Sequence, residues 1–160
     1  ELFYHKQYEY AILILKKFLE EPDGWIENKL NSCLVLSCCY QAMGENAAAF
    51  DILFYSFTMD VPRAEICCEI GRLFMEKREY VTAAYWYQQA LLAPRKKKNG
   101  GFYIADSHDF IPAIQMCVCL DKAGRHREAF EFHKKARVLK PLHQAVIGNE
   151  KYFRDVWGME

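Results

Sequence analysis

Apolar residues recur along this chain every three or four positions, which is the spacing of an amphipathic helix. The first run of this kind lies between residues 8 and 21, and its apolar face consists of Tyr8, Ala11, Ile12, Leu15, Phe18 and Leu19. Pro22, Asp23 and Gly24 follow as helix-terminating residues. Further runs of the same kind follow, and no stretch gives a convincing strand. The pattern therefore predicts an all-α protein.

The stretch from Ala64 to Pro94 sets out a helical hairpin that recurs along the chain. Small residues at Gly71, Ala83 and Ala90 would let two helices approach closely, and aromatic residues between them would fill the space beside the contact. Ala49 stands 34 residues before Ala83, and this is the length of the tetratricopeptide repeat. The register predicts tetratricopeptide-type antiparallel helix hairpins, stacked into a right-handed superhelix with a C-terminal capping helix.

We expect a single domain over residues 1–160. Its predicted parts are a partial hairpin at 1–22, hairpins at 25–60, 62–94 and 110–141, an insertion loop at 95–109 and a capping helix at 143–156. In the partial hairpin, residues 1–6 would end one helix and residues 8–21 would form its partner. Because the chain enters the repeat partway, we expect it to be a piece of a longer polypeptide.

Composition narrows the possible partners. The formal net charge is zero, so the overall charge does not favour nucleic acid or an anionic membrane. No apolar run approaches the ~20 residues that a membrane span needs. The seven cysteines are an odd number without the spacing of a disulfide framework. Cys33, Cys67 and Cys117 take repeat positions where small apolar side chains would pack, which predicts structural thiols and a reducing, cytoplasmic compartment.

Candidate catalytic or metal-binding chemistry is sparse. His108 beside Asp106 and Asp109 is the best candidate for a metal or acid–base cluster, but Asp109 also fits the N-cap of a following helix that tolerates Pro112 in its first turn. His133 takes the repeat position of a core tyrosine and is expected to be a packed core histidine. We therefore expect no catalytic residue, no metal site and no cofactor in this chain.

The repeat register also predicts which residues line a concave groove, because the first helix of each hairpin faces inward in such arrays. The predicted lining is Asn31, Leu34, Cys38, Gln41, Glu65, Cys68, Arg72, Met75, Glu76, Ile111, Ile114, Val118, Asp121 and Lys122. A groove of this mixed character suits a protein or peptide partner, including a second copy of the chain. In the insertion loop, the predicted contact residues are Phe102, Tyr103, Ile104 and His108. The adjacent basic run 95–98 could bind phosphate or form a solvated loop.

Three short motifs stand in a distinctive order from the insertion onwards. They are Gly100-Gly101-Phe102, Phe110-Ile111-Pro112 and Cys117-Val118-Cys119. In this order, and within the flanking repeats from Glu65 to Phe153, they resemble the C-terminal tetratricopeptide region of bacterial family 2 glycosyltransferases. The segment 105–109 departs from that family's pattern, where proline and aromatic residues are expected.

The resemblance implies a parent enzyme with a nucleotide-sugar domain, an Asp-x-Asp motif and a divalent metal. No Asp-x-Asp occurs in the printed sequence, so no catalytic residue is carried over. This chain would then supply dimerisation, or dock the acceptor or a partner protein onto the catalytic domain. Two alternatives stay open: a stand-alone scaffold or peptide receptor unconnected to sugar transfer, and an enzyme that uses His108 with its acidic neighbours.

Overall fold

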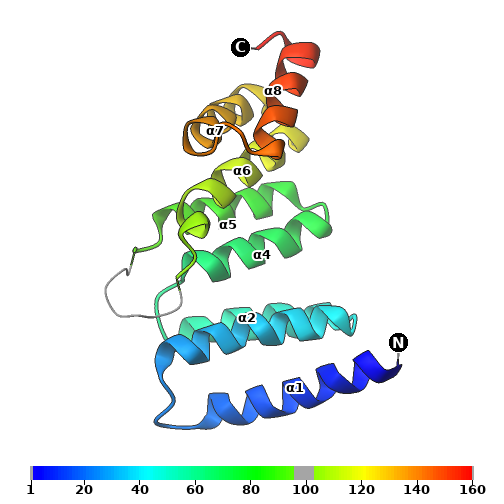
Figure 1. Ribbon diagram of the computed structural model, residues 1–160, viewed down its shortest axis with the longest axis vertical. Helices are drawn as coiled ribbons and strands as arrows, with labels where there is room; N and C mark the ends of the chain where they lie inside the picture. Colours follow the sequence, from blue (N-terminus) through cyan, green and yellow to red (C-terminus); the bar gives the residue numbers. More distant parts are fainter. Residues whose placement is uncertain (1, 96–102, 160) are drawn as a thin grey trace. The chain divides into compact units, whose positions relative to one another are not determined.

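The computed structural model describes residues 2–95 and 103–159, with side chains from Lys6 onwards (Figure 1). The described residues form α-helices and short 3-10 turns, without strands, as the sequence predicts. The helices are α1 (Leu2–Glu20), α2 (Ile26–Ala42), α3 (Asn46–Tyr55), α4 (Ala64–Glu76), α5 (Tyr80–Leu92), α6 (Phe110–Lys122), α7 (His126–Leu139) and α8 (Gln144–Trp157), and the turns are η1 (Ser56–Thr58) and η2 (Ala105–His108). Among the described helices, none is both long and apolar enough to cross a bilayer.

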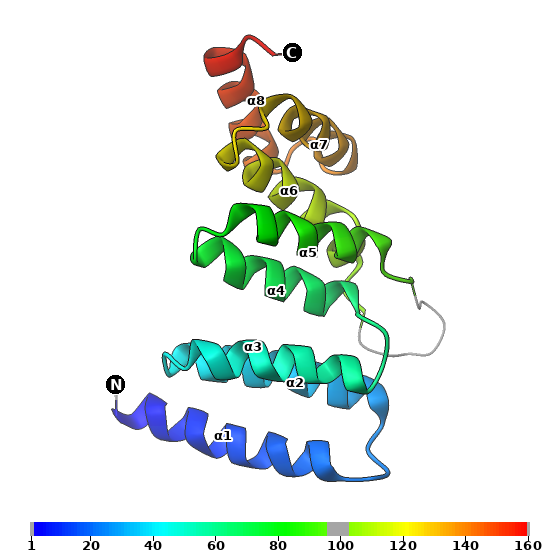
Figure 2. The same cartoon turned by 180° about the vertical axis from the view of Figure 1, so that it is seen from behind.

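Three pairs of consecutive helices pack as hairpins: α2 with α3, α4 with α5, and α6 with α7 (Figures 1 and 2). They fall within the spans predicted for the full hairpins. Gly44 and Gly124 lie in the turns of the first and last hairpin, both at φ +78°. This left-handed conformation strains residues with a Cβ, so glycine permits the tight turn.

Helix α1 corrects one sequence-based expectation. Residues 2–20 form one continuous helix, where the sequence analysis placed the end of one helix and the start of another. No glycine, proline or turn-forming residue stands between Lys6 and Tyr8, and the first helix breaker is Pro22. Helix α1 packs against α2, as the second helix of a preceding hairpin would.

The chain divides into two compact units. Of the described residues, unit 1 holds 2–62 together with Tyr103, and unit 2 holds 63–95 and 104–159. The main division follows Pro62, the residue that marks the start of the hairpin at 62–94. Each unit is described by itself below, and the expectation of a single domain over 1–160 stays a prediction.

Close helix contacts in the α4/α5 hairpin of unit 2 depend on small residues. A Cβ placed on Gly71 would lie 3.0 Å from two ring carbons of Tyr87, and Ala83 and Ala90 are fully buried on the facing helix α5. Tyr87 itself is 1% exposed. The predicted role of these small residues as close-contact positions is therefore confirmed.

Six of the seven cysteines are buried as small apolar residues, Cys38 is exposed, and none of the seven is in a disulfide. Cys33, Cys67 and Cys117 are buried in the helix interfaces. Burial raises the pKa of the Cys33 thiol to about 11 and is the largest cause that raises the pKa values of Cys67 and Cys117 to about 12. These thiols stay neutral and unreactive at physiological pH.

Candidate functional site

The end of the insertion, from Ile104 to His108, packs onto α4. The Ile104 backbone N–H donates to Oε1 of Glu65 at 2.7 Å, and the Cys68 thiol donates to the Ser107 carbonyl at 3.5 Å. Nε2 of His108 lies 3.6 Å from the same Glu65 oxygen. Turn η2 thereby packs over the first turns of α4 within unit 2.

This contact corrects part of the predicted groove. Glu65 and Cys68 are 5% and 8% exposed because η2 covers them, so neither can line an open surface. Ile114 is also buried, since it packs with Phe110 and Val146 in a small apolar cluster. The predicted groove residues Glu65, Cys68 and Ile114 therefore support the fold of unit 2.

The other predicted groove residues are at least partly accessible. In unit 2, Glu76 and Lys122 are exposed, and half-buried positions are taken by Arg72, Met75, Ile111, Val118 and Asp121. In unit 1, α2 exposes Asn31 and Cys38 and half-buries Leu34 and Gln41. Binding of a partner by these residues stays a prediction.

The residues predicted to make contacts from the insertion loop differ in their exposure. Phe102 lies outside the described residues, and so do residues 96–98 of the basic run. Tyr103 is half-buried and Ile104 is 46% exposed. His108 is buried, which removes it from any surface contact.

The candidate cluster around His108 does not converge on a common point. Asp106 pairs with Lys140, the residue that follows α7. Asp109 accepts a hydrogen bond from the Phe110 N–H at 2.6 Å and faces Arg95. Asp109 is thus the N-cap of α6, as the sequence predicts. In the described part of the chain, no group of three His, Cys, Asp or Glu side chains could hold a metal ion.

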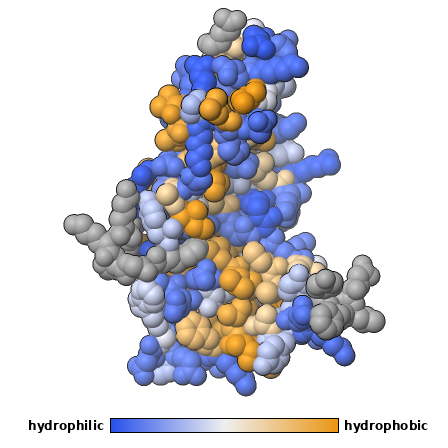
Figure 3. Space-filling view, in the orientation of Figure 1, coloured by the Kyte–Doolittle hydropathy of each residue, from blue (hydrophilic) through white to orange (hydrophobic). Residues whose placement is uncertain are grey.

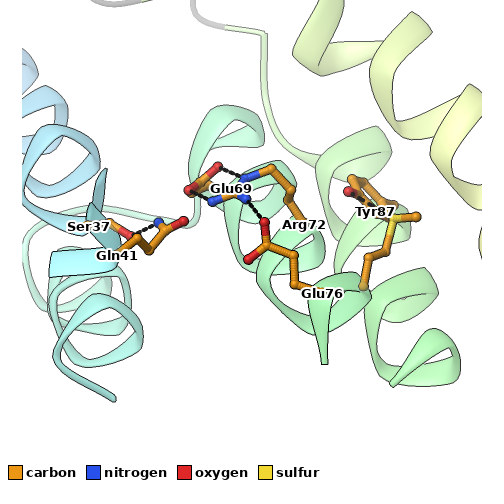
Figure 4. A network of polar contacts seen from close by, with 7 residues as sticks. Ser37, Gln41, Glu69, Arg72, Glu76 and Tyr87 are labelled. Carbon is orange, nitrogen blue, oxygen red and sulfur yellow. Dashed lines mark hydrogen bonds and ion pairs between the residues drawn. The ribbon is translucent and has the colours of Figure 1, made fainter. Parts of the chain in front are cut away.

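On α4, three charged side chains form a network along the helix (Figure 4). The Arg72 guanidinium donates to both carboxylate oxygens of Glu69, at 2.9 and 2.6 Å, and also pairs with Glu76. The network leaves α4 with a net charge of −1 on this face. Because each such pair adds only about 0.2–0.5 kcal/mol, its main effect is to hold Arg72 in place.

Figure 4 also shows a contact within unit 1, where Gln41 Nε2 donates to the Ser37 hydroxyl at 3.1 Å along α2. This hydrogen bond orients one of the predicted groove residues, Gln41, along its own helix.

One pocket of unit 2 lies between α6 and α8. We call it the α6–α8 pocket; it encloses about 180 Å³ and is lined by Cys117, Val118, Asp121, Lys122, Asn149, Tyr152 and Phe153. Val118 and the buried Phe153 form an apolar floor. The Asn149 amide donates to the Cys117 sulfur at 3.5 Å, which joins the two walls.

A chain of polar contacts fixes the rim of the pocket. Asp121 accepts a hydrogen bond from the Tyr152 hydroxyl at 2.9 Å through Oδ2, and its Oδ1 lies 2.7 Å from Nδ1 of His126. The Trp157 indole N–H donates to the Tyr152 oxygen at 3.2 Å, and its ring stacks on His126 with centroids 3.8 Å apart. These contacts tie the end of α8 to α6 and to the start of α7.

One cation, Lys122, lines the pocket. Lys122 on α6 and Lys151 on α8 are exposed, and within the described residues neither has an ion-pair partner. Apolar surface also gathers over α7 and α8 (Figure 3), where Val138, Leu142 and Ile147 are exposed. This end of unit 2 therefore offers both positive charge and apolar area to a partner.

The sequence analysis named Val118, Asp121 and Lys122 but missed the wall that α8 supplies. Helix α8 begins 34 residues after α6, so it takes the place of a first helix in the next repeat. Tyr152 accordingly stands 34 residues after Val118. This spacing is the signal that could have placed Asn149 and Tyr152 in the site.

Comparisons with known proteins support the fold. The chain matches no protein-family model and no curated protein. Among solved structures, the crystal structure of MamA is similar, with a TM-score of 0.64 and 23% sequence identity over 92% of this chain and 81% of that one. The likeness to MamA, a tetratricopeptide-like protein, is one of fold, and none of these comparisons links the chain to family 2 glycosyltransferases. The chain thus has the predicted tetratricopeptide-type helical-repeat fold.

Proposed function

We propose that this chain is a non-catalytic protein-interaction module that binds an extended peptide in the α6–α8 pocket. The observation that carries the proposal is the pocket itself, in which an apolar floor lies beneath a rim of hydrogen-bonded polar side chains. Sites of this composition accept one apolar side chain and orient the backbone around it.

The geometry gives little support to catalysis at this site. The Asp121 carboxylate is engaged by both Tyr152 and His126, so it orients its neighbours and is poorly placed to take a proton from a ligand. Burial, as the largest cause, raises the pKa of the Cys117 thiol to about 12, and a thiol that stays protonated is a poor nucleophile.

The Lys122 charge in the pocket lining indicates what the peptide carries. Lys122 would meet an acidic side chain or a carboxylate, and Val118 would meet an apolar side chain. Charge complementarity of this kind favours specificity and fast association more than affinity. We therefore infer a ligand in which an apolar residue is flanked by Asp or Glu.

A library of random peptides displayed on phage tests the proposal. Selected peptides should show an apolar residue with acidic neighbours and should lose binding to a Val118→Arg variant. Val81→Arg is the matched control, because Val81 is 67% exposed on α5 and lies outside the pocket. Peptides that bind Val118→Arg and the unchanged chain equally well would refute the pocket as the binding site.

We also propose that the chain is the C-terminal region of a bacterial, cytoplasmic family 2 glycosyltransferase, where it docks the acceptor or a partner protein, its own catalytic domain or a second copy. The support is the order of the Gly-Gly-Phe, Phe-Ile-Pro and Cys-Val-Cys motifs, and the unbridged cysteines fit a reducing compartment. Such a parent enzyme would use a nucleotide sugar and a divalent metal. The coding sequence before Glu1 tests this: alternating strands and helices with an Asp-x-Asp are expected, and further hairpins alone would contradict it.

A further inference from the structure

A histidine with no hydrogen bond lies in the interior of unit 2. His133 on α7 is 0% exposed, and in the part of the chain that the structure describes neither of its ring nitrogens has a hydrogen-bond partner. Its ring belongs to a cluster of three: the centroids of Phe130 and of Phe153 on α8 lie 5.8 and 5.6 Å from it, and 5.3 Å from each other. Buried polar atoms without partners are uncommon and call for an explanation.

The preceding hairpin shows what this repeat position otherwise holds. Tyr87 takes it there, and its hydroxyl reaches the sulfur of Met75 at 3.5 Å while its ring packs over Gly71. In the last hairpin, Cys117 stands where Gly71 stands, and the aromatic residue is His133. The histidine fills a similar space but adds a group that can take up a proton.

The surroundings admit a neutral imidazole and oppose a charged one. Burial lowers the pKa of His133, and this is the largest cause; Glu150 on α8 raises it and Arg137 on α7 lowers it again. Glu150 and Arg137 are themselves paired at 2.8 Å, so the carboxylate is already engaged. On α6, the Cys117 thiol is neutral.

A proton can reach His133 most easily by displacement of α8. This helix contributes Phe153 and Val146 to the interior, and Phe153 contacts the histidine ring directly. Helix α7 is held more firmly, since it also forms the hairpin with α6. Movement of α8 would bring water to the imidazolium and would remove Phe153, Tyr152 and Asn149 from the α6–α8 pocket.

We propose that His133 is a pH-sensitive latch, whose protonation releases α8 from α7 and dismantles the α6–α8 pocket. Because the latch would regulate peptide binding, this inference rests on the proposed function. Because the pKa is lower in the folded state, the docked form of α8 is fully favoured above the ordinary histidine pKa of about 6.5. As the pH falls below that value, the equilibrium constant for docking of α8 decreases. The decrease is at most about tenfold for each pH unit, which is the limit for uptake of one proton.

Hydrogen exchange of the whole chain tests the latch without a peptide. After correction for intrinsic exchange, the amides of α8 should lose protection between pH 7.5 and pH 5.5, while those of α4 should keep it. His133→Phe and His133→Tyr remove the titrating group and keep an aromatic ring, and both should abolish the pH effect. Two other histidines touch α8: His126 stacks on Trp157, and His143 caps the helix by accepting from the Ala145 N–H. His126→Gln and His143→Gln are their controls, and both should retain the pH effect.

Peptide binding then separates this inference from the proposed function. A peptide from the phage selection should bind less tightly at pH 5.5 than at pH 7.5, and His133→Phe should remove most of that difference. If α8 loses protection only in chains with His133 but no selected peptide depends on the pocket, the latch stands and the proposed function fails. If either His133 variant that folds shows the same pH effect on α8 as the unchanged chain, the latch is wrong.

Discussion

Two glycines in helices of unit 2 allow the packing argument to be tested with one chemical change. Gly71 lies inside α4 and Gly148 inside α8. A Cβ on Gly71 would meet the Tyr87 ring at 3.0 Å, whereas a Cβ on Gly148 would have no neighbour within 4 Å. The same substitution, glycine to alanine, should therefore have opposite effects at the two positions.

The magnitudes follow from two opposing contributions. Alanine is better than glycine in a helix interior by about 1 kcal/mol, and Gly148→Ala should gain most of this. At Gly71 the same gain is offset by overpacking, which costs typically about 1–3 kcal/mol. Tyr87 is fully enclosed and its hydroxyl contacts Met75, so its ring has little room to shift. We expect Gly71→Ala to be the less stable of the two by about 2 kcal/mol.

Urea unfolding measures this difference. Because the chain has two compact units, unfolding of unit 2 should be followed by the fluorescence of Trp86 and Trp157 in a background where Trp25 of unit 1 is replaced by phenylalanine. Equal midpoints for Gly71→Ala and Gly148→Ala would show that Tyr87 accommodates a methyl group. The proposed close contact between α4 and α5 would then be refuted.

Three further predictions concern single contacts. Asp109→Ala should destabilise unit 2 by about 1 kcal/mol in urea unfolding, because the Phe110 N–H loses its cap; an unchanged midpoint would contradict the capping role. Glu65→Ala should speed hydrogen exchange at the Ile104 amide, since it removes the acceptor at 2.7 Å, and unaltered protection would show that η2 stays docked without it. A thiol reagent at pH 8 should modify Cys38 rapidly, because it is the exposed cysteine, and all seven only after denaturation; fast reaction of a second thiol would contradict the burial of the others.

The local features of the fold could be predicted from the sequence because they depend on residues close together along the chain. Helical spacing of apolar residues marks the hairpins, and glycines that reach φ +78° mark two of their turns. The position of Asp109 before α6 similarly indicates the N-cap. The small side chain at Gly71 predicts a close approach, since a repeat of known length places an aromatic residue opposite it.

Tertiary structure decided the features that depend on distant contacts. Glu65 has the repeat position of a groove residue, yet a segment 39 residues later covers it. No periodicity in the insertion predicts where that segment docks. The sequence of α8 predicts only a capping helix. Its role as a wall of the α6–α8 pocket depends on the contact between Tyr152 and Asp121, which belong to different helices. Helix formation depends mainly on the local pattern of residues, so the sequence alone determined the helices. Burial and pocket formation depend on which segments meet in space, so only the folded chain decided them.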